Sequence, residues 1–392
     1  GEQKLKEAVL YAEQEFRPSA IIVVNSCVPA LIGDDIDGVL EQLQTRVAAT
    51  IVPIHCEGFK TKIMASAYDS AYHGILRNLL EVKEKPQLFD PEDELELLKE
   101  KYRISKTINL LNVSSMSAFD EIELKRMLGA LGLNLKILPC YAHPDDFSWV
   151  NEAALNVSIC ATHDDYFVNH LKELYGIPFV LNTIPIGIYH TNKWLRDIAK
   201  HMGIEEETEN FIRAETAELE KALEPYKKIL AGKKVFLGGG EIRILSTAEL
   251  LQSLGMEVVG LKGYHYDHFA DELIEALPGS DKIVFNVANG QPFEQANLVA
   301  RLKPDIYIGH GSTNAATAKQ GIPIFPLFGQ TVNYMGYSGA FEIVRRIARV
   351  LRNPGFNRNL AQHTRLPYHD LWYKEDPFAY IDDSVRQDAG NR

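Results

Sequence analysis

The segment Ser19–Ser26, SAIIVVNS, together with the helical pattern of Ile36–Leu43 after it, sets the fold of this 392-residue chain. A short run of β-branched residues bounded by polar residues predicts a buried strand, and the apolar residues after the turn recur at helical spacing. Ala48–Ile54 then repeats the strand, and Ala65–Leu80 repeats the helix. Strands that alternate with helices form parallel sheets, because parallel neighbours require crossover connections.

The same alternation returns in two further cycles along the chain. Further strands are predicted at Thr107–Val113, Asn134–Pro139, Asn156–Ile159, Ile177–Leu181, Lys234–Leu237, Met256–Gly260, Lys282–Val287, Asp305–Gly309 and Ile322–Leu327. Further helices are predicted at Asp120–Leu131, Trp149–Leu155, Tyr166–Tyr175, Glu205–Leu230 and about 245–254. We therefore predict an α/β protein with three doubly wound parallel-sheet lobes. The predicted divisions are a first, partial lobe at 1–95, a second lobe at 96–204, a long helix with a third lobe at 205–352, and a carboxy-terminal tail at 353–392, laid over a surface.

The composition excludes several classes of protein. The chain has 53 acidic and 41 basic residues, a net charge of −12, which argues against a nucleic-acid partner bound through a basic surface. No run approaches 18 apolar residues, and residues 1–16 form a charged helical pattern, so neither a membrane span nor a secretion signal is expected. With four cysteines and no disulfide framework, we expect a cytoplasmic protein.

All four cysteines directly follow predicted strands: Cys27, Cys56, Cys140 and Cys160. Ligands of open parallel sheets bind beyond the carboxyl ends of the strands, so each position is suited to a site. No two cysteines form a CxxC pair, which excludes a zinc knuckle or ribbon. An isolated cysteine is also commonly a small buried apolar residue, and the spacing alone leaves both interpretations open.

Gly238-Gly239-Gly240 follows the predicted strand at 234–237 and opens a helix. Such a loop can offer backbone N–H groups to an anion or to inorganic sulfide. It is not a GxGxxG dinucleotide motif, because Glu241 and Ile242 precede Arg243. A GxxxxGK[ST] motif for ATP is absent from the sequence.

The densest histidine features are Tyr264–His268, YHYDH, and His310. A mononuclear metal site from His265, Asp267 and His268 is conceivable, but residues 265 and 267 share one face of a strand whereas 268 does not. A structural loop is therefore the preferred interpretation over a metal site.

Several segments, taken in order, carry a family resemblance. They begin with Cys27–Asp37 (CVPALIGDDID), His55–Phe59 (HCEGF) and the Cys160-x5-Tyr166-x8-Tyr175-Gly-Ile-Pro pattern. The later ones are Lys303-Pro304-Asp305, Gly309-x-Gly311, Gly321-Ile322-Pro323 and Tyr334-Met335-Gly336-Tyr337. Over residues 1–352 the chain resembles the nitrogenase component 1 family, which includes dinitrogenase subunits, cofactor-assembly scaffold subunits and relatives in tetrapyrrole reduction.

The resemblance implies particular cofactors and partners. Cys27 matches a ligand of an iron–sulfur cluster shared with a partner chain, and Cys160 matches the single cysteine that holds an iron–molybdenum-type or related metal–sulfur cofactor. The glycines Gly238, Gly239 and Gly240 would line that cofactor, whereas the match for Cys56 is not a cluster ligand. The implied partners are a homologous β-like subunit or a second copy of this chain, and an ATP-dependent iron protein. Because α-type subunits carry further cluster cysteines upstream, we expect that an amino-terminal part is missing here.

The sequence also departs from the catalytic subunits that it resembles. A cofactor-binding histidine is expected shortly after Pro323, but Ile324–Asn333 contains none, and Phe328 is the nearest match. A lysine is replaced near Thr313, and an arginine beside the glycine loop is replaced by Glu241. An anionic cluster beside Glu241 would lose a stabilising charge and gain an opposing one.

Three hypotheses follow. The first is a nitrogenase-like oxidoreductase subunit that reduces a small molecule with electrons from the iron protein, and the missing histidine disfavours dinitrogen as that molecule. The second is a non-catalytic scaffold for assembly of the iron–molybdenum-type cofactor. The third is a metal-free α/β protein with core cysteines. The first two require the sulfurs of Cys27 and Cys160 to face a dry crevice between lobes.

Overall fold

The computed structural model describes residues 1–61, 63–80, 94–112, 116–181, 184–288, 290–309, 311–329 and 331–376. The chain divides into two compact units. Unit 1 comprises Gly1–Met116, Leu124–Ile184 and Lys193–Phe211, and unit 2 comprises Ser117–Glu123, Pro185–Asn192 and Ile212–Arg392. Unit 1 holds two parallel sheets and unit 2 holds a third. Among the described residues, no helix combines the length and apolar character needed to cross a bilayer.

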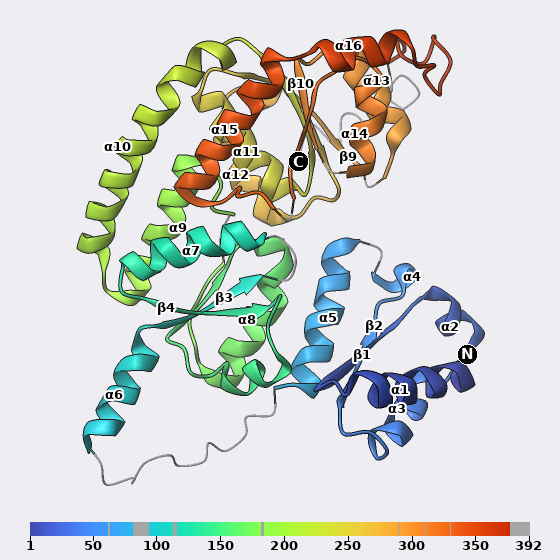
Figure 1. Cartoon of the computed structure of the whole chain (residues 1–392), viewed down its shortest axis with the longest axis vertical. Coiled ribbons are helices and arrows are strands. Elements are labelled where there is room, and N and C mark those ends of the chain that lie inside the picture. The colour runs from blue at the N-terminus through green and yellow to red at the C-terminus, as the bar shows by residue number, and fades with distance from the viewer. Residues whose placement is uncertain are drawn as a thin grey trace. The chain divides into compact units, whose positions relative to one another are not determined.

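The first sheet of unit 1 is a pair of parallel strands, β1 (Ala20–Asn25) and β2 (Thr50–His55). The helices of this part are α1 (Glu2–Phe16), α2 (Cys27–Ile32), α3 (Ile36–Gln44), α4 (Gly58–Thr61) and α5 (Met64–Asn78) (Figure 1). Val9 of α1, Val39 and Leu43 of α3 and Ile51 of β2 form one apolar core. The apolar residues that predicted the helix over 36–43 therefore cover one side of this sheet.

The second sheet of unit 1 has four parallel strands in the order β4–β3–β5–β6. Their bounds are β3 (Thr107–Asn112), β4 (Asn134–Pro139), β5 (Leu155–Ser158) and β6 (Phe179–Val180). The order reverses between β3 and β5, which makes their carboxyl ends the topological switch point where open sheets bind ligands. The accompanying helices are α6 (Glu94–Ser105), α7 (Ala118–Ala130), the 3₁₀ helix η1 (Pro144–Trp149), α8 (Ala161–Tyr175) and α9 (Gly187–Met202).

Helix α5 packs against α8 and joins the two parts of unit 1. Tyr72 of α5 stacks on Phe167 of α8 with ring centroids 4.5 Å apart, within a core that also contains Leu111, Leu138 and Leu171. This packing brings α5 next to the helix that begins directly after Cys160.

Unit 2 is built on five parallel strands in the order β11–β10–β7–β8–β9. Their bounds are β7 (Lys234–Gly239), β8 (Glu257–Gly263), β9 (Val284–Val287), β10 (Ile306–Gly309) and β11 (Ile324–Pro326). The helical elements are α10 (Glu205–Leu230), α11 (Glu241–Ser253), η2 (His268–Ala270), α12 (Asp271–Ala276), η3 (Ser280–Lys282), α13 (Pro292–Leu302), α14 (Gly311–Ala318), α15 (Gly336–Arg352) and α16 (Gly355–Gln362). Helices α11 and α12 contact each other on one side of the sheet, and α13 and α14 contact each other on the opposite side (Figure 1). The order reverses between β7 and β10, so the sheet is doubly wound.

The predicted α/β class with parallel sheets is confirmed, and each predicted strand overlaps an observed one. The helix predicted at Trp149–Leu155 is wrong, because η1 ends at Trp149 and Leu155 already begins β5. The Lys136 side chain donates to the carbonyl of Trp149, and the Asn109 side chain donates to the carbonyl of Val150. The Trp149 carbonyl also accepts the Glu152 N–H at 3.0 Å, which closes a single turn, and the chain then enters β5 at Leu155 instead of continuing as a helix.

The carboxy-terminal segment contains helix α16 and then lies on unit 2 without further helix or strand as far as residue 376. Trp372 stacks on Phe293 of α13 with ring centroids 3.5 Å apart, and the Trp372 indole N–H donates to the Phe293 carbonyl at 2.9 Å. The Asn297 amide donates to the carbonyl of Glu375 at 2.7 Å. The predicted lobe boundaries at 95, 204 and 352 remain a proposal, and His310, Val113 and the Thr313 side chain lie outside the described part of the chain.

Candidate functional site

Cys160 lies at the switch point of the four-stranded sheet. It follows β5 directly and is the N-cap residue of the 15-residue helix α8, with an extended backbone (φ −153°, ψ 104°). The helix begins five residues before the predicted start at Tyr166, so the cysteine stands at its amino end. Its side chain is 7% exposed. The partial positive charge of a helix amino terminus favours an anionic group such as a thiolate.

A buried hydrogen-bond network holds the backbone of Cys160 in place. The Cys160 N–H donates to Ser158 Oγ at 2.9 Å, and the Ser158 hydroxyl donates to Asp164 Oδ2 at 2.6 Å. The Tyr72 hydroxyl donates to Asp164 Oδ1 at 2.7 Å, and the Trp194 indole N–H donates to the Ser158 carbonyl at 3.2 Å. Burial raises the pKa of Asp164 to about 6, although the hydrogen bonds from Ser158 and Tyr72 lower it.

Cys27 lies at the carboxyl end of β1 as the first residue of α2, and it is half-buried. The backbone N–H of Gly58 donates to Cys27 Sγ at 3.1 Å. A Cβ atom added at Gly58 would lie 3.4 Å from this sulfur, an ordinary contact, so the hydrogen bond and not the lack of a side chain defines this approach. The HCEGF segment and the CVPALIGDD segment are thus brought together at one sheet edge.

Glu57 is the buried charge beneath this turn. Its Oε1 accepts a hydrogen bond from the Asn25 amide at 3.0 Å and lies 3.3 Å from the Lys60 ammonium and 3.6 Å from His55 Nδ1. Burial opposes its ionisation, but its own backbone N–H, Lys60 and His55 outweigh burial and hold the pKa of Glu57 below its ordinary value. The carboxylate therefore fixes the ends of β1 and β2 on either side of Cys27.

The three glycines Gly238, Gly239 and Gly240 stand at the switch point of the five-stranded sheet, at the end of β7 and the N-cap of α11. A Cβ atom at Gly238 would lie 2.4 Å from the hydroxyl oxygen of Tyr307, a fully buried ring on β10. A Cβ atom at Gly240 would meet no described atom within 4 Å. Gly238 is therefore explained by packing, whereas the loop has open space beside Gly240.

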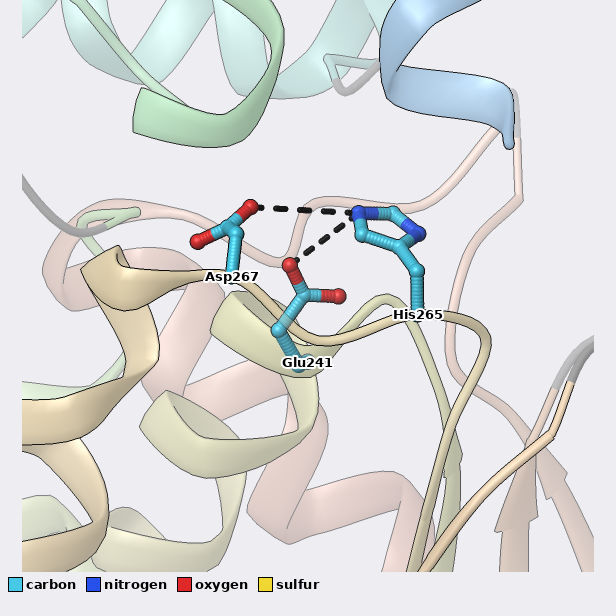
Figure 2. Close-up of side chains that lie close together, drawn as sticks. All are labelled: Glu241, His265 and Asp267. Atoms are coloured by element: carbon cyan, nitrogen blue, oxygen red, sulfur yellow. Dashed lines mark ion pairs between the residues drawn. The ribbon is translucent and has the colours of Figure 1, made fainter. Parts of the chain in front are cut away.

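Glu241, His265 and Asp267 converge next to this loop (Figure 2). Glu241 is the first residue of α11, and the other two residues follow β8, the strand next to β7. His265 Nε2 lies 3.1 Å from Glu241 Oε1 and 4.0 Å from Asp267 Oδ2. Burial disfavours the charged form of both groups, but the attraction between the carboxylate and the imidazolium outweighs burial. The pKa of Glu241 is therefore lowered, and the pKa of His265 is raised.

This cluster corrects the histidine site considered from the sequence. His268 is exposed, with its ring tilted by 37° against that of Phe269, whereas Glu241 is the third member of the cluster. The sequence did contain a signal for Glu241 as a member of this cluster. Glu241 and His265 follow two consecutive strands, and consecutive strands are usually neighbours in a parallel sheet.

Phe328, at the position where a histidine was expected, packs against a buried cation. The Arg243 guanidinium lies 5.4 Å from the centre of the Phe328 ring and 6.0 Å from that of Tyr334. Arg243 is 7% exposed, and such desolvated cation–π contacts contribute about 2 kcal/mol. The residue after the glycine loop is therefore anionic, but a cation stands two positions later.

Comparisons with known proteins identify the family of this chain. The family described as "Nitrogenase component 1 type Oxidoreductase" matches residues 1–352. The chain belongs to this family. The resemblance noted in the sequence is thereby confirmed, and the nitrogenase component 1 fold accounts for the parallel sheets.

Relatives within the nitrogenase component 1 family carry two kinds of name. The nitrogenase iron-molybdenum cofactor biosynthesis protein NifE of Rippkaea orientalis is 28% identical over 96% of this chain and 76% of that protein. The nitrogenase molybdenum-iron protein alpha chain of Methanococcus maripaludis is 25% identical over 91% of this chain and 72% of that protein. A solved structure titled "Nitrogenase Cp1 at pH 6.5" matches 94% of this chain and 78% of its own with a TM-score of 0.74 and 20% identity, which shows a shared fold.

The described cysteines fit single ligands of a metal–sulfur cluster. Cys160 offers one buried sulfur at a helix amino terminus, and Cys27 offers one sulfur that already accepts a backbone N–H. Neither provides the four thiolates that an iron–sulfur cubane needs, so further ligands would have to come from other residues or another chain. Cys56 and Cys140 are half-buried and follow β2 and β4 directly. A crevice shared by Cys27 and Cys160 remains a prediction.

Proposed function

We propose that this chain is an α-like subunit that holds a metal–sulfur cluster through Cys160 and serves as a scaffold for cofactor assembly. The observation that carries the proposal is the Cys160 position itself, a buried sulfur at a sheet switch point whose backbone is fixed by Ser158 and Asp164. When bound, such a cluster stores and transfers electrons. The chain's own residues would orient one thiolate and exclude water around it.

Two observations favour a scaffold over a dinitrogen-reducing subunit. Glu241 stands where an arginine is expected beside the glycine loop, and its carboxylate pairs with His265, so this position supplies no cation to retain an anionic cluster. The segment 324–333 contains no histidine, and the described Phe328 packs on Arg243 instead. Relatives named as cofactor biosynthesis proteins support the same choice.

An oxidoreductase that reduces a small molecule is the second candidate. It is favoured by the relatives named as nitrogenase alpha chains and by the Cys160 position, which serves a catalytic cluster equally well. In this case electrons would come from an ATP-dependent iron protein and pass through a cluster at Cys27. We infer a substrate other than dinitrogen because the expected histidine is absent.

A homologous partner subunit is part of both candidates. Five apolar side chains around Cys27 are exposed: Ile22, Val24, Val28, Leu31 and Ile32. Several exposed apolar side chains on one strand and the short helix after it are typical of a protein–protein interface. It supports assembly with a β-like subunit or a second copy of this chain next to the Cys27 cluster.

Anaerobic purification of the full-length protein with its partner, followed by iron and acid-labile sulfide analysis, tests the proposal. We expect brown protein with both elements, and Cys160→Ala should lower the iron content and abolish delivery of a cofactor to an acceptor protein. Cys140→Ser is the matched control and should keep the metal content, because nothing in the motifs assigns it a ligand role. If the wild type turns over a substrate and Cys160→Ala abolishes this turnover, the oxidoreductase is favoured. A colourless, iron-free complex would refute both cluster-binding candidates and support the metal-free hypothesis.

A further inference from the structure

The cluster of Glu241, His265 and Asp267 has the composition of a metal site that is separate from the cysteines. One imidazole nitrogen and one oxygen from each carboxylate all lie within 4.8 Å of one another. Figure 2 shows the two carboxylates on the same side of the His265 ring, facing Nε2. Ligands about 2.1 Å from one ion stand roughly 3 to 3.5 Å apart, so the 3.1 Å separation of His265 Nε2 from Glu241 Oε1 already matches shared coordination.

The protein orients each of the three donors. Asp267 caps the 3₁₀ helix η2 by accepting the Phe269 N–H on Oδ1 at 3.0 Å, which leaves Oδ2 as the oxygen 4.0 Å from His265 Nε2. Glu241 is fixed at the first position of α11 and is 1% exposed. A small rotation of the Asp267 side chain would bring the third donor within coordination distance.

His265 supplies a second, independent observation. The ring is 5% exposed, and neither nitrogen makes a hydrogen bond with the described residues: Nε2 lies 3.1 Å from Glu241 Oε1, but the contact does not have hydrogen-bond geometry. A buried polar atom without a hydrogen bond costs about 1 to 3 kcal/mol, so such groups are rare unless another ligand satisfies them. A metal ion between the carboxylates would satisfy Nε2.

We propose that Glu241, His265 and Asp267 bind one divalent first-row transition-metal ion. A nitrogen with two carboxylate oxygens suits ions such as Zn²⁺, Fe²⁺ or Co²⁺ better than Ca²⁺ or Mg²⁺, which take oxygen ligands. Two carboxylates also balance the two positive charges of the ion, so a neutral imidazole completes a site with no net charge. Asp267 is 23% exposed, which gives the ion a route to the site and leaves room for water as a further ligand.

The site does not depend on the proposed function. It uses no cysteine, and it would exist whether Cys160 holds a cluster, a precursor or nothing. Failure of the cluster experiments and failure of this site are therefore distinguishable. The competing interpretation is a simple buried ion pair between Glu241 and His265.

Titration of the purified, chelator-treated full chain with Co²⁺ distinguishes the two. Cobalt bound by nitrogen and oxygen gives visible ligand-field bands, whereas cobalt bound by cysteine adds intense sulfur-to-metal charge-transfer bands, so the two kinds of site are separable by absorption. We expect one equivalent of cobalt per chain without the sulfur bands. Absence of this equivalent, or binding with sulfur bands alone, would overturn the proposal.

Three variants connect the signal to the residues. Asp267→Asn keeps the acceptor that caps η2, and Glu241→Gln keeps the side-chain size, so both test charge and coordination with little change in shape. We expect each to weaken cobalt binding by at least about 100-fold, because a ligand contributes no less than the outer-sphere groups that change affinity by 10- to 100-fold. His268→Asn, at the exposed neighbour, is the control and should bind like the wild type. If the buried Glu241→Gln variant does not fold, Asp267→Asn still tests the proposed metal site. Wild-type cobalt affinity in Asp267→Asn would contradict the assignment.

Discussion

Individual buried carboxyl groups in this protein differ in whether a nearby cation stabilises their negative charge. Glu57 has Lys60 and His55 nearby, and Glu241 has His265, so the pKa of each carboxyl group lies below its ordinary value. No cation among the described residues plays this part for Glu249 on α11: desolvation by burial raises its pKa from 4.5 to about 7. The charge on Glu249 therefore opposes folding, and the charge on Glu57 does not.

The stability of unit 2 should consequently depend on the protonation of Glu249. The unfolded carboxyl loses its proton near pH 4.5 and the folded one near pH 7, so the free energy of unfolding should fall as pH rises between these values. At about 1.4 kcal/mol per pKa unit, and allowing for its partial exposure, we expect Glu249→Gln to stabilise the protein by about 2 kcal/mol at pH 8. Urea denaturation should show little difference between variant and wild type at pH 4, below both pKa values. A constant difference at both pH values would contradict this explanation.

The hydroxyl of Tyr72 should contribute measurably to the region around Cys160. Tyr72→Phe removes the hydrogen bond to Asp164 and leaves one carboxylate oxygen without this donor. We expect the free energy of unfolding to fall by about 1.5 to 3 kcal/mol, because the bond is buried and involves an ionisable acceptor. Tyr102→Phe, at an exposed ring of α6, is the control and should change stability by less than about 0.5 kcal/mol. Equal effects in chemical denaturation would mean that the network does not stabilise unit 1.

At the level of elements, the glycine loop combines a packing role with an open position. The buried ring of Tyr307 requires a glycine at 238, whereas Gly240 has an ordinary backbone (φ −61°, ψ 134°) and open space. We expect Gly238→Ala to destabilise the protein by about 1 to 3 kcal/mol through overpacking, and Gly240→Ala to change stability by less than about 1 kcal/mol. Thermal denaturation measures both. Partial recovery in the double variant Gly238→Ala/Tyr307→Phe would identify the ring hydroxyl as the cause, and no recovery would refute it.

The elements also show what a sequence can and cannot predict. Strands such as Asn134–Pro139 were predicted well because their β-branched and apolar runs are local signals bounded by turns. The false helix at 149–155 reflects contacts with residues distant in sequence. The side chains of Lys136 and Asn109 bind the carbonyls of Trp149 and Val150, and no local pattern reveals these contacts. The ligand Glu241 was missed for the same reason, since its partner His265 follows the next strand.

At the scale of the whole molecule, apolar surface around Cys27 contrasts with the net charge of −12. Five exposed aliphatic residues lie on β1 and α2, and we propose that a partner covers this surface in the working protein. Cys27 lies within this group and is half-buried. This juxtaposition links the partner and the Cys27 cluster in our proposal, because a cluster there needs thiolates that this cysteine alone does not provide.

Charge placed in this surface should therefore prevent assembly without unfolding the chain. Leu31 is 72% exposed and lies in α2, so Leu31→Asp costs little in the isolated subunit but would bury an unpaired carboxylate in an interface. After co-expression with the homologous partner, we expect a loss of at least about 100-fold in affinity by sedimentation velocity, and a loss of the iron that depends on Cys27. Leu174→Asp, at an equally apolar and 57% exposed position on α8, is the matched control and should assemble normally. Normal assembly of Leu31→Asp, or equal loss in both variants, would place the partner on another surface.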